Sequence, residues 1–188
     1  MASYVVLLRG INVGGKNKIL MADLKKLLVE DGFEAVQSYI QSGNLIIQSS
    51  LSAETISQRI ENLLPIHFNL DRSLIRVLVI PSQTYQQIIA AAPTDFGQDP
   101  LFRYDVIFLI GVSIKEALLQ VELKDGVDEC WPFESVIFFK RPGPQHTDYT
   151  KSALSKLVKK PIYQSMTIRN WKTATRLLFL LEEHIMLE

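Results

Sequence analysis

A short polar turn between two apolar runs is the feature that most limits the fold of this chain. Residues 33–40 and 45–48 are strand-like, and the residues between them are Gln41, Ser42, Gly43 and Asn44. A cluster of this kind indicates a β-hairpin, whereas a purely parallel sheet needs a crossover helix at this point. A simple Rossmann arrangement is therefore excluded.

The elements on either side of the hairpin complete a β-α-β-β-α-β order. Apolar runs at residues 4–9 and 75–80 are typical of buried strands. One helix is indicated by leucines at helical spacing before a capping glycine, and another by a serine cap and apolar residues three and four apart before a proline. These residues are Leu24, Leu27, Leu28, Gly32, Ser52, Ile56, Ile60, Leu63, Leu64 and Pro65. This is the order of a ferredoxin-like split unit.

The second half of the chain resembles the first in element order, although the two halves share no sequence similarity. The turn-rich stretch 93–100 suggests a boundary, so we predict sub-domains at residues 1–92 and 93–188. The expected strands are 104–110, 127–131 and 135–140, and the expected helices are 82–92, 114–119, 150–158 and 169–185. The predicted class is α+β, with two ferredoxin-like sub-domains and mixed or antiparallel sheets.

The composition of the chain indicates in which cellular compartment the protein is expected. A chain of 188 residues with 47% apolar content has enough apolar residues for a sizeable core. Arg9 interrupts the first apolar run before it reaches signal-peptide length, and later runs are too short for the ~20 residues that cross a bilayer. The lone Cys130 fits a reducing compartment. We therefore expect a cytoplasmic protein without membrane contact.

Charge is unevenly distributed along the chain, although the net charge is zero. Residues 140–176 contain nine Lys or Arg and one acidic residue, whereas residues 95–134 contain nine acidic residues and three basic ones. This pattern is compatible with an electropositive surface for phosphate-bearing partners, including nucleic acid. The alternative is that the lysines solvate helix faces and pair with the acidic segment.

The loop after the first strand is the leading candidate for a functional site. Gly10, Gly15 and Lys16 match the spacing of a phosphate-binding loop, but Asn17 replaces the hydroxyl residue that would hold magnesium. The glycines still allow left-handed backbone whose N–H groups suit an anion. The predicted ligand-binding residues of this loop are Arg9, Asn12, Gly14, Gly15, Lys16, Asn17 and Lys18. The alternative is a flexible connection whose glycines only turn the chain.

Two further segments supply candidate ligand contacts. Arg169 and Asn170 are expected at the start of the last helix, with Thr167 as N-cap. A bound anion there would offset the unfavourable placement of cations at a helix N-terminus. Gln41, Ser42 and Asn44 are the third set, although a simple turn also explains them. The three histidines have no metal-ligand spacing, so neither a metal nor a cofactor is predicted, and no catalytic residue is assigned.

Four motifs stand out in the sequence: residues 7–17 (LLRGINVGGKN), 21–24 (MADL), 39–44 (YIQSGN) and 167–171 (TIRNW) with Thr173. Together they resemble a known family, the domain of unknown function 1697 family. They are distributed over nearly the whole chain. Leu20 is a departure, since a proline is expected there in many members, and it affects only the entry to the first helix. The resemblance implies an α+β fold of ferredoxin-like sub-domains. It implies no activity, because the family's name assigns none.

Three functional hypotheses remain open at this point. The first is a module that binds a phosphate-bearing or other anionic ligand, nucleotide or nucleic acid, at the glycine-rich loop. The second is an enzyme of unrecognised class acting on an anionic substrate. The third is a structural or oligomerisation module without a ligand. The sequence does not indicate an oligomeric state.

Overall fold

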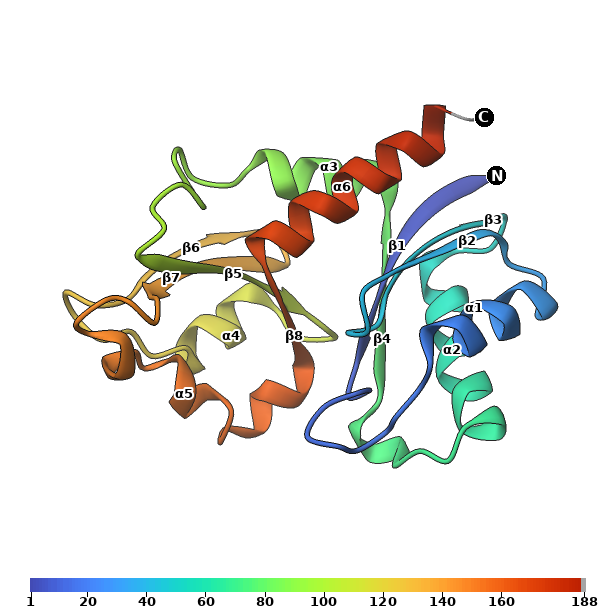
Figure 1. Ribbon diagram of the computed structural model, residues 1–188, viewed down its shortest axis with the longest axis horizontal. Helices are drawn as coiled ribbons and strands as arrows, with labels where there is room; N and C mark the ends of the chain where they lie inside the picture. The colour runs from blue at the N-terminus through green and yellow to red at the C-terminus, as the bar shows by residue number, and fades with distance from the viewer. Residues whose placement is uncertain (187–188) are drawn as a thin grey trace. The chain divides into compact units, whose positions relative to one another are not determined.

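The computed structural model describes residues 1–186 (Figure 1). Contacts divide the chain into two units: Met1–Gln87 with the chain from Arg176 onward, and Ile88–Thr175. The sequence-based division at residues 92 and 93 differs from this grouping, because the end of the last helix groups with the first unit. Residues 187 and 188 of the predicted second sub-domain lie outside the described range.

The first unit contains a four-stranded antiparallel sheet in the order β2-β3-β1-β4. Its strands are β1 (Ala2–Arg9), β2 (Glu34–Tyr39), β3 (Asn44–Ser49) and β4 (Arg76–Pro81). The first and third strands lie at the centre, as in a ferredoxin-like split unit. The predicted hairpin is formed by β2 and β3, with Tyr39 opposite Asn44.

Two helices cover one face of this sheet, α1 (Met21–Glu30) and α2 (Ala53–His67) (Figure 1). Their buried residues Leu24, Leu28, Ile56 and Ile60 pack with Val6 and other side chains of the sheet in one core. The Ser52 hydroxyl accepts from the Thr55 backbone N–H, which confirms the predicted cap of α2. The connection to β4 includes the 3₁₀ turn η1 (Arg72–Leu74).

The second unit has the same strand relation in its own antiparallel sheet, whose order is β6-β7-β5-β8. Its strands are β5 (Phe102–Leu109), β6 (Glu129–Phe133), β7 (Val136–Pro142) and β8 (Met166–Asn170). Two helices, α4 (Ile114–Gln120) and α5 (Leu154–Leu157), contribute Ala117 and Leu157 to the core on one sheet face. Helix α3 (Ser82–Ala90) leads from the first unit into the second. The protein is thus α+β, with two similar ferredoxin-like units.

Strand β8 is absent from the sequence prediction, which placed Arg169 and Asn170 in the last helix with Thr167 as its cap. These three residues instead belong to β8, which pairs with β5 from Asp105 to Leu109. Helix α6 (Trp171–Met186) begins after it, and the Thr173 N–H donates to Asn170 Oδ1 at 2.8 Å. Pairing with a central strand decides the conformation of this short segment, whose own residues give no strong helical or strand signal.

The predicted helix over residues 150–158 is also broken. It is replaced by the 3₁₀ turn η2 (Tyr149–Lys151) and the single turn α5, followed by η3 (Pro161–Ser165). The Ala153 N–H donates to Asp128 Oδ2 at 2.8 Å, so it is not available for a continuous helical ladder. Asp128 is buried and also accepts from the Lys124 N–H, which makes it the anchor of this interruption.

No helix among the described residues is long and apolar enough to cross a membrane.

Candidate functional site

The glycine-rich loop folds as a small hairpin, which we call the glycine hairpin (residues 12–17). The Lys16 N–H donates to the Val13 carbonyl at 3.0 Å, and the Asn12 N–H donates to the Asn17 carbonyl at 3.0 Å. Gly14 and Gly15 have φ of +58° and +77°, the left-handed pair that a type I′ turn requires. The loop is therefore a defined turn with two exposed glycines at its tip.

The two asparagines of the hairpin hold it to the rest of the first unit. Asn12 donates from Nδ2 to the carbonyls of Ile19 and Gln41, at 2.9 and 2.7 Å, and accepts from the Ile19 N–H at 2.8 Å. Asn17 donates to the Gly10 carbonyl at 2.8 Å and accepts from the Asp71 N–H at 2.8 Å. Both side-chain amide groups are thus engaged with backbone.

Other predicted residues near the hairpin also make local structural contacts. Asn44 is buried and donates to the Tyr39 carbonyl and the Ser42 hydroxyl, at 3.1 and 2.9 Å. Arg9 donates to the Leu74 carbonyl at 3.1 Å. These bonds define the turn between β2 and β3 and the end of β1. Ligand binding by these side chains stays a prediction.

A hollow of about 360 Å³ opens beside the glycine hairpin. We call it the hairpin pocket; its lining residues are Asn12, Gly15, Lys18, Ile19, Leu20 and Gln41. Lys18 is the only charged side chain of this lining and is exposed, and Leu20 is 67% exposed. The pocket therefore combines one cation, polar groups and an apolar wall.

Lys16 lies near an acidic partner, outside the hairpin-pocket lining. The pKa of Asp71 is lowered, first by hydrogen bonds from the Ser73 hydroxyl and backbone N–H and also by the charge of Lys16. Lys18 is therefore the better placed of the two lysines to meet a ligand in this pocket.

Arg169 and Asn170 belong to the second unit. Arg169 is buried at 8% exposure, and its Nη1 donates to the Thr167 hydroxyl and the Ile168 carbonyl, both at 2.9 Å. Asn170 caps α6 through Oδ1. The hypothesis that this segment shares one site with the glycine hairpin stays a prediction.

The connection between α3 and β5 (residues 93–100) forms two further hollows in the second unit. Phe96 lies at its centre, with ring centroids 4.9 Å from Tyr104, 5.4 Å from Phe138, 6.0 Å from Trp131 and 5.2 Å from Trp171. This cluster covers the sheet face opposite α4 and α5. The sequence prediction treated the stretch as a turn-rich linker and missed this role.

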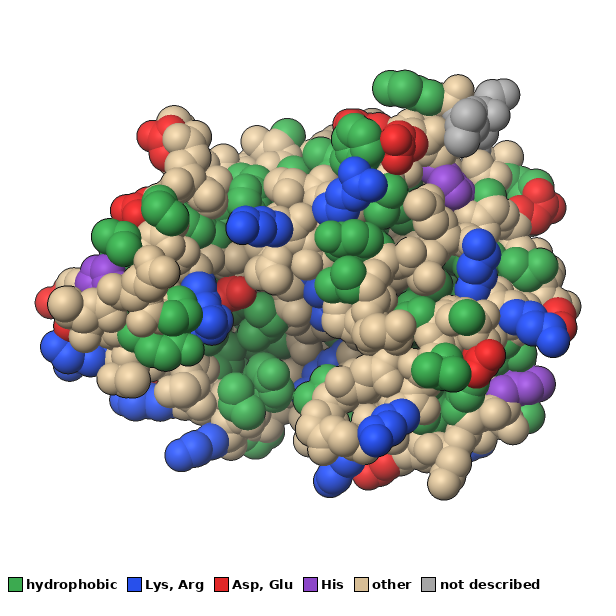
Figure 2. Space-filling model, in the orientation of Figure 1, with side chains coloured by type: hydrophobic (Ala, Val, Ile, Leu, Met, Phe, Trp, Pro, Cys, Tyr) green, Lys and Arg blue, Asp and Glu red, His purple; other side chains and the backbone are tan. Residues whose placement is uncertain are grey.

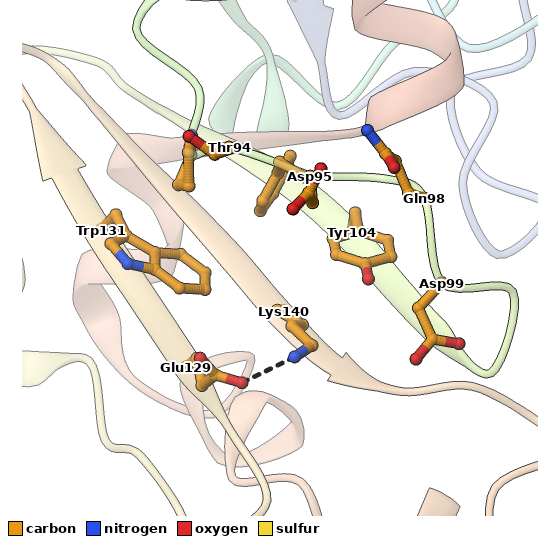
Figure 3. A pocket seen from close by; sticks show the side chains of 10 residues that line it. Thr94, Asp95, Gln98, Asp99, Tyr104, Glu129, Trp131 and Lys140 are labelled. Atoms are coloured by element: carbon orange, nitrogen blue, oxygen red, sulfur yellow. Dashed lines mark hydrogen bonds and ion pairs between the residues drawn. The ribbon is translucent and has the colours of Figure 1, made fainter.

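The first of these hollows, the aromatic pocket, measures about 290 Å³ and is acidic (Figure 3). Its lining residues are Pro93, Thr94, Asp95, Phe96, Gln98, Asp99, Tyr104, Glu129, Trp131 and Lys140. Lys140 Nζ is 2.7 Å from Glu129 Oε1, so the single cation is already paired with one of three carboxylates. This surplus of acidic groups makes the pocket unsuitable for the anionic ligand predicted from the sequence.

The second hollow, the arginine pocket, measures about 470 Å³. Its lining residues are Gly97, Asp99, Pro100, Phe102, Arg103, Tyr104, Asp105, Arg141, Asn170, Trp171 and Lys172. Of the residues predicted to bind a ligand, only Asn170 lines it. Arg103 and Arg141 were missed because each stands at one end of an apolar run, and their proximity depends on strand register.

Four of the nine basic residues of the basic segment pair with the acidic one. Lys140, Arg141, Lys156 and Lys160 all form ion pairs with carboxylates from residues 95–134, and Lys151 pairs with Asp148. On the face shown in Figure 2, Lys and Arg side chains are spread among apolar and acidic ones and form no continuous patch. The sequence asymmetry thus corresponds in part to pairing between the two segments.

Two observations concern metal ligands and the single cysteine in the described part of the chain. Residues 1–186 contain no group of three or more His, Cys, Asp or Glu side chains placed to hold a metal ion. Burial raises the pKa of the Cys130 thiol, which disfavours the reactive thiolate.

The fold and pockets define a two-unit α+β protein in which each unit is ferredoxin-like. The chain belongs to the family described as "Protein of unknown function (DUF1697)", whose model matches residues 1–138. A similar solved structure is that of the conserved bacterial protein SP0830 from Streptococcus pneumoniae, at 31% identity and a TM-score of 0.81. The match covers 96% of this chain and 98% of that chain. No curated protein matches the sequence.

Proposed function

We propose that this protein binds a small phosphate-bearing ligand, such as a nucleotide, in the hairpin pocket of its first unit. One observation carries the proposal: Asn12, Gly15, Lys18 and Gln41, all selected from the sequence as ligand contacts, line a single hollow. These residues come from two different loops. Asn12 and Gln41 are 29 positions apart in the sequence, and a hydrogen bond from the Asn12 side chain to the Gln41 carbonyl joins the two loops. Hydrogen bonding thus fixes the two sides of the pocket before any ligand arrives.

The chemistry of the pocket suits an anion with an apolar part. Lys18 supplies a flexible ammonium group that acts on a phosphate as a point charge. The exposed turn at Gly14 and Gly15 leaves backbone close to the pocket without Cβ atoms in the way. Ile19 and Leu20 supply an apolar wall against which a nucleobase or similar ring can pack.

The distribution of cations favours a small ligand over a nucleic acid. Nucleic-acid affinity depends on several unpaired Lys and Arg side chains that neutralise successive phosphates. Lys140, Lys156 and Lys160 of the basic segment instead pair with carboxylates elsewhere in the second unit. A pocket with the single cation Lys18 matches one phosphate group better than a strand of them.

The test compares Lys18→Gln with a matched control, Lys25→Gln. Lys25 is an exposed lysine of α1 in the same unit and is not among the residues that line the pocket, so the control removes the same charge elsewhere. Calorimetric titration of a nucleotide panel in low-salt buffer should detect binding to the wild type and the control. Loss of one charge-assisted contact should weaken binding about ten-fold in Lys18→Gln.

The proposal fails if no nucleotide binds at low salt, or if the two variants bind equally. Short single-stranded oligonucleotides provide the second arm of the experiment. If they bind while mononucleotides do not, and with a steep dependence on salt, the partner is a nucleic acid and the small-ligand assignment is wrong.

A further inference from the structure

We propose that the second unit has its own ligand site, the arginine pocket, which binds a carboxylate or phosphate group attached to a planar ring. This inference is independent of the proposed function, because it uses different residues in a different unit. The site has three parts: two arginines from adjacent strands, a lysine at the start of α6, and aromatic walls.

The two arginines stand directly opposite each other across the β5·β7 ladder. Arg103 and Arg141 are register partners, so their side chains project from the same face of the sheet. Like charges in this position repel each other and destabilise a sheet. Among residues 1–186, one carboxylate compensates them by an ion pair: Asp105 Oδ2 lies 2.8 Å from Arg141 Nε, and the Asp105 side chain is 8% exposed.

Most of the donor capacity of these arginines remains available. Within residues 1–186, the Nη atoms of Arg141 have no protein hydrogen-bond partner, since Asp105 engages only Nε. Arg103 is exposed, and its guanidinium lies 5.4 Å from the ring centroid of Tyr149. Its side-chain N–H groups have no hydrogen-bond partner among residues 1–186. Each arginine therefore presents unused N–H groups.

The charge balance of the pocket favours an anion. Its lining includes three cations and two carboxylates. Asp105 is engaged with Arg141, and Asp99 Oδ1 accepts from the Leu101 backbone N–H at 2.9 Å. Lys172 is exposed and adds a third cation near the first turn of α6. An incoming anion would remove the repulsion that Arg103 and Arg141 experience without it.

The shape and walls of the pocket narrow the ligand class. Arginine presents a planar fork of donors that matches carboxylate and phosphate oxygens in pairs. The half-buried Trp171 lines the same hollow and offers flat apolar surface, whereas the ring of Phe102 already lies against Lys140 and His146. A volume of about 470 Å³ is within the usual range for a small-molecule site. An aryl phosphate or aryl carboxylate combines both features.

The experiment titrates phenyl phosphate, benzoate and inorganic phosphate into the full-length protein and follows tryptophan fluorescence and heat. Trp171 lines the pocket, so a bound ring should change its emission. The key variant is Arg103→Gln, because Arg103 is exposed and its loss leaves the Asp105 ion pair intact. The control is Lys159→Gln, which removes a charge from an exposed lysine of the same unit that is not part of the pocket lining.

Phenyl phosphate or benzoate should bind saturably to wild type and Lys159→Gln, and about ten-fold more weakly to Arg103→Gln. The preferred acid shows which oxyanion the arginines hold. Equal affinity in Arg103→Gln and Lys159→Gln would overturn the inference, as would the absence of saturable binding at millimolar ligand. Loss of the signal in Lys18→Gln alone would assign it to the hairpin pocket and would also overturn the inference. Inorganic phosphate binding as tightly as phenyl phosphate would rule out the aromatic part of the site.

Discussion

The glycine hairpin and the connection between α3 and β5 are both irregular segments, yet they are held in place by opposite means. The glycine hairpin is fixed by polar groups, because Asn12 and Asn17 bond to backbone on neighbouring segments. The connection is fixed by aromatic packing, because Phe96 is buried among the rings of its unit. One segment is anchored by hydrogen bonds and the other by burial of apolar surface.

This difference shows why residue type alone is a poor guide to which loop residues bind a ligand. Asparagines in a glycine-rich loop are typical ligand donors, but Asn12 and Asn17 also bond to backbone carbonyl and N–H groups of neighbouring segments. The stretch 93–100 looks like a linker, but it lines the aromatic pocket and the arginine pocket. Ligand binding in such a chain depends on the polar and charged groups that are not already engaged in contacts within the fold.

The largest expected effect is on the aromatic anchor. Phe96→Ala should lower the free energy of unfolding by roughly 3–5 kcal/mol, because it leaves a cavity among four aromatic rings. Chemical denaturation followed by circular dichroism measures this. The control Leu119→Ala removes a side chain that is 77% exposed and should cost about 0.5 kcal/mol or less. Equal losses in the two variants would mean that Phe96 does not anchor the connection.

Alanine substitutions at two glycines, one in each segment, compare the two kinds of anchoring in more detail. Both Gly97 and Gly14 have positive φ, but a Cβ on Gly97 would lie 2.1 Å from Trp171 Cδ1, whereas none on Gly14 would meet an atom within 4 Å. Gly97→Ala should therefore add a steric cost of about 1–3 kcal/mol to the backbone strain of about 1 kcal/mol that both variants share. Thermal unfolding of the two variants gives the comparison. A Gly14→Ala loss as large as that of Gly97→Ala would contradict the aromatic packing.

The sequence predicted most of the fold, because most elements carry a strong local signal. The apolar run of β1 and the polar turn at residues 41–44 each indicate their structure from a few adjacent residues. The spacing of Leu24, Leu27 and Leu28 does the same for α1. Strand β8 was missed because Met166–Asn170 becomes a strand only by pairing with β5. Its register partners are distant in the sequence: Leu109 pairs with Met166, 57 positions away, and Asp105 pairs with Asn170, 65 positions away.

The candidate sites were predictable only in part, for a related physical reason. Asn12, Lys18 and Gln41 were selected from local composition, and the hairpin pocket contains all three. Arg103 and Arg141 could not be found in that way, because they are 38 positions apart in the chain and the register of β5 and β7 brings them together. The buried Asp128 likewise breaks the predicted helix over residues 150–158 through a side-chain bond that no spacing rule reveals.

The smallest expected effect tests whether the polar anchor of the glycine hairpin is structural. Asn17→Ala removes a side chain with 8% exposure that bonds to Gly10 and Asp71, and it leaves their backbone groups without these partners. The expected loss is about 1–3 kcal/mol in the free energy of unfolding, measured by chemical denaturation. Asn62→Ala, at an exposed position of α2, is the control and should cost nothing, because alanine favours helix more than asparagine does.

If Asn17→Ala is as stable as its control but loses nucleotide binding, the asparagine is a ligand contact after all. Asn17 would then not hold the glycine hairpin in place, and the contrast between polar and aromatic anchoring would be wrong for the glycine hairpin. A side chain that contributes nothing to folding stability is available to bind a ligand.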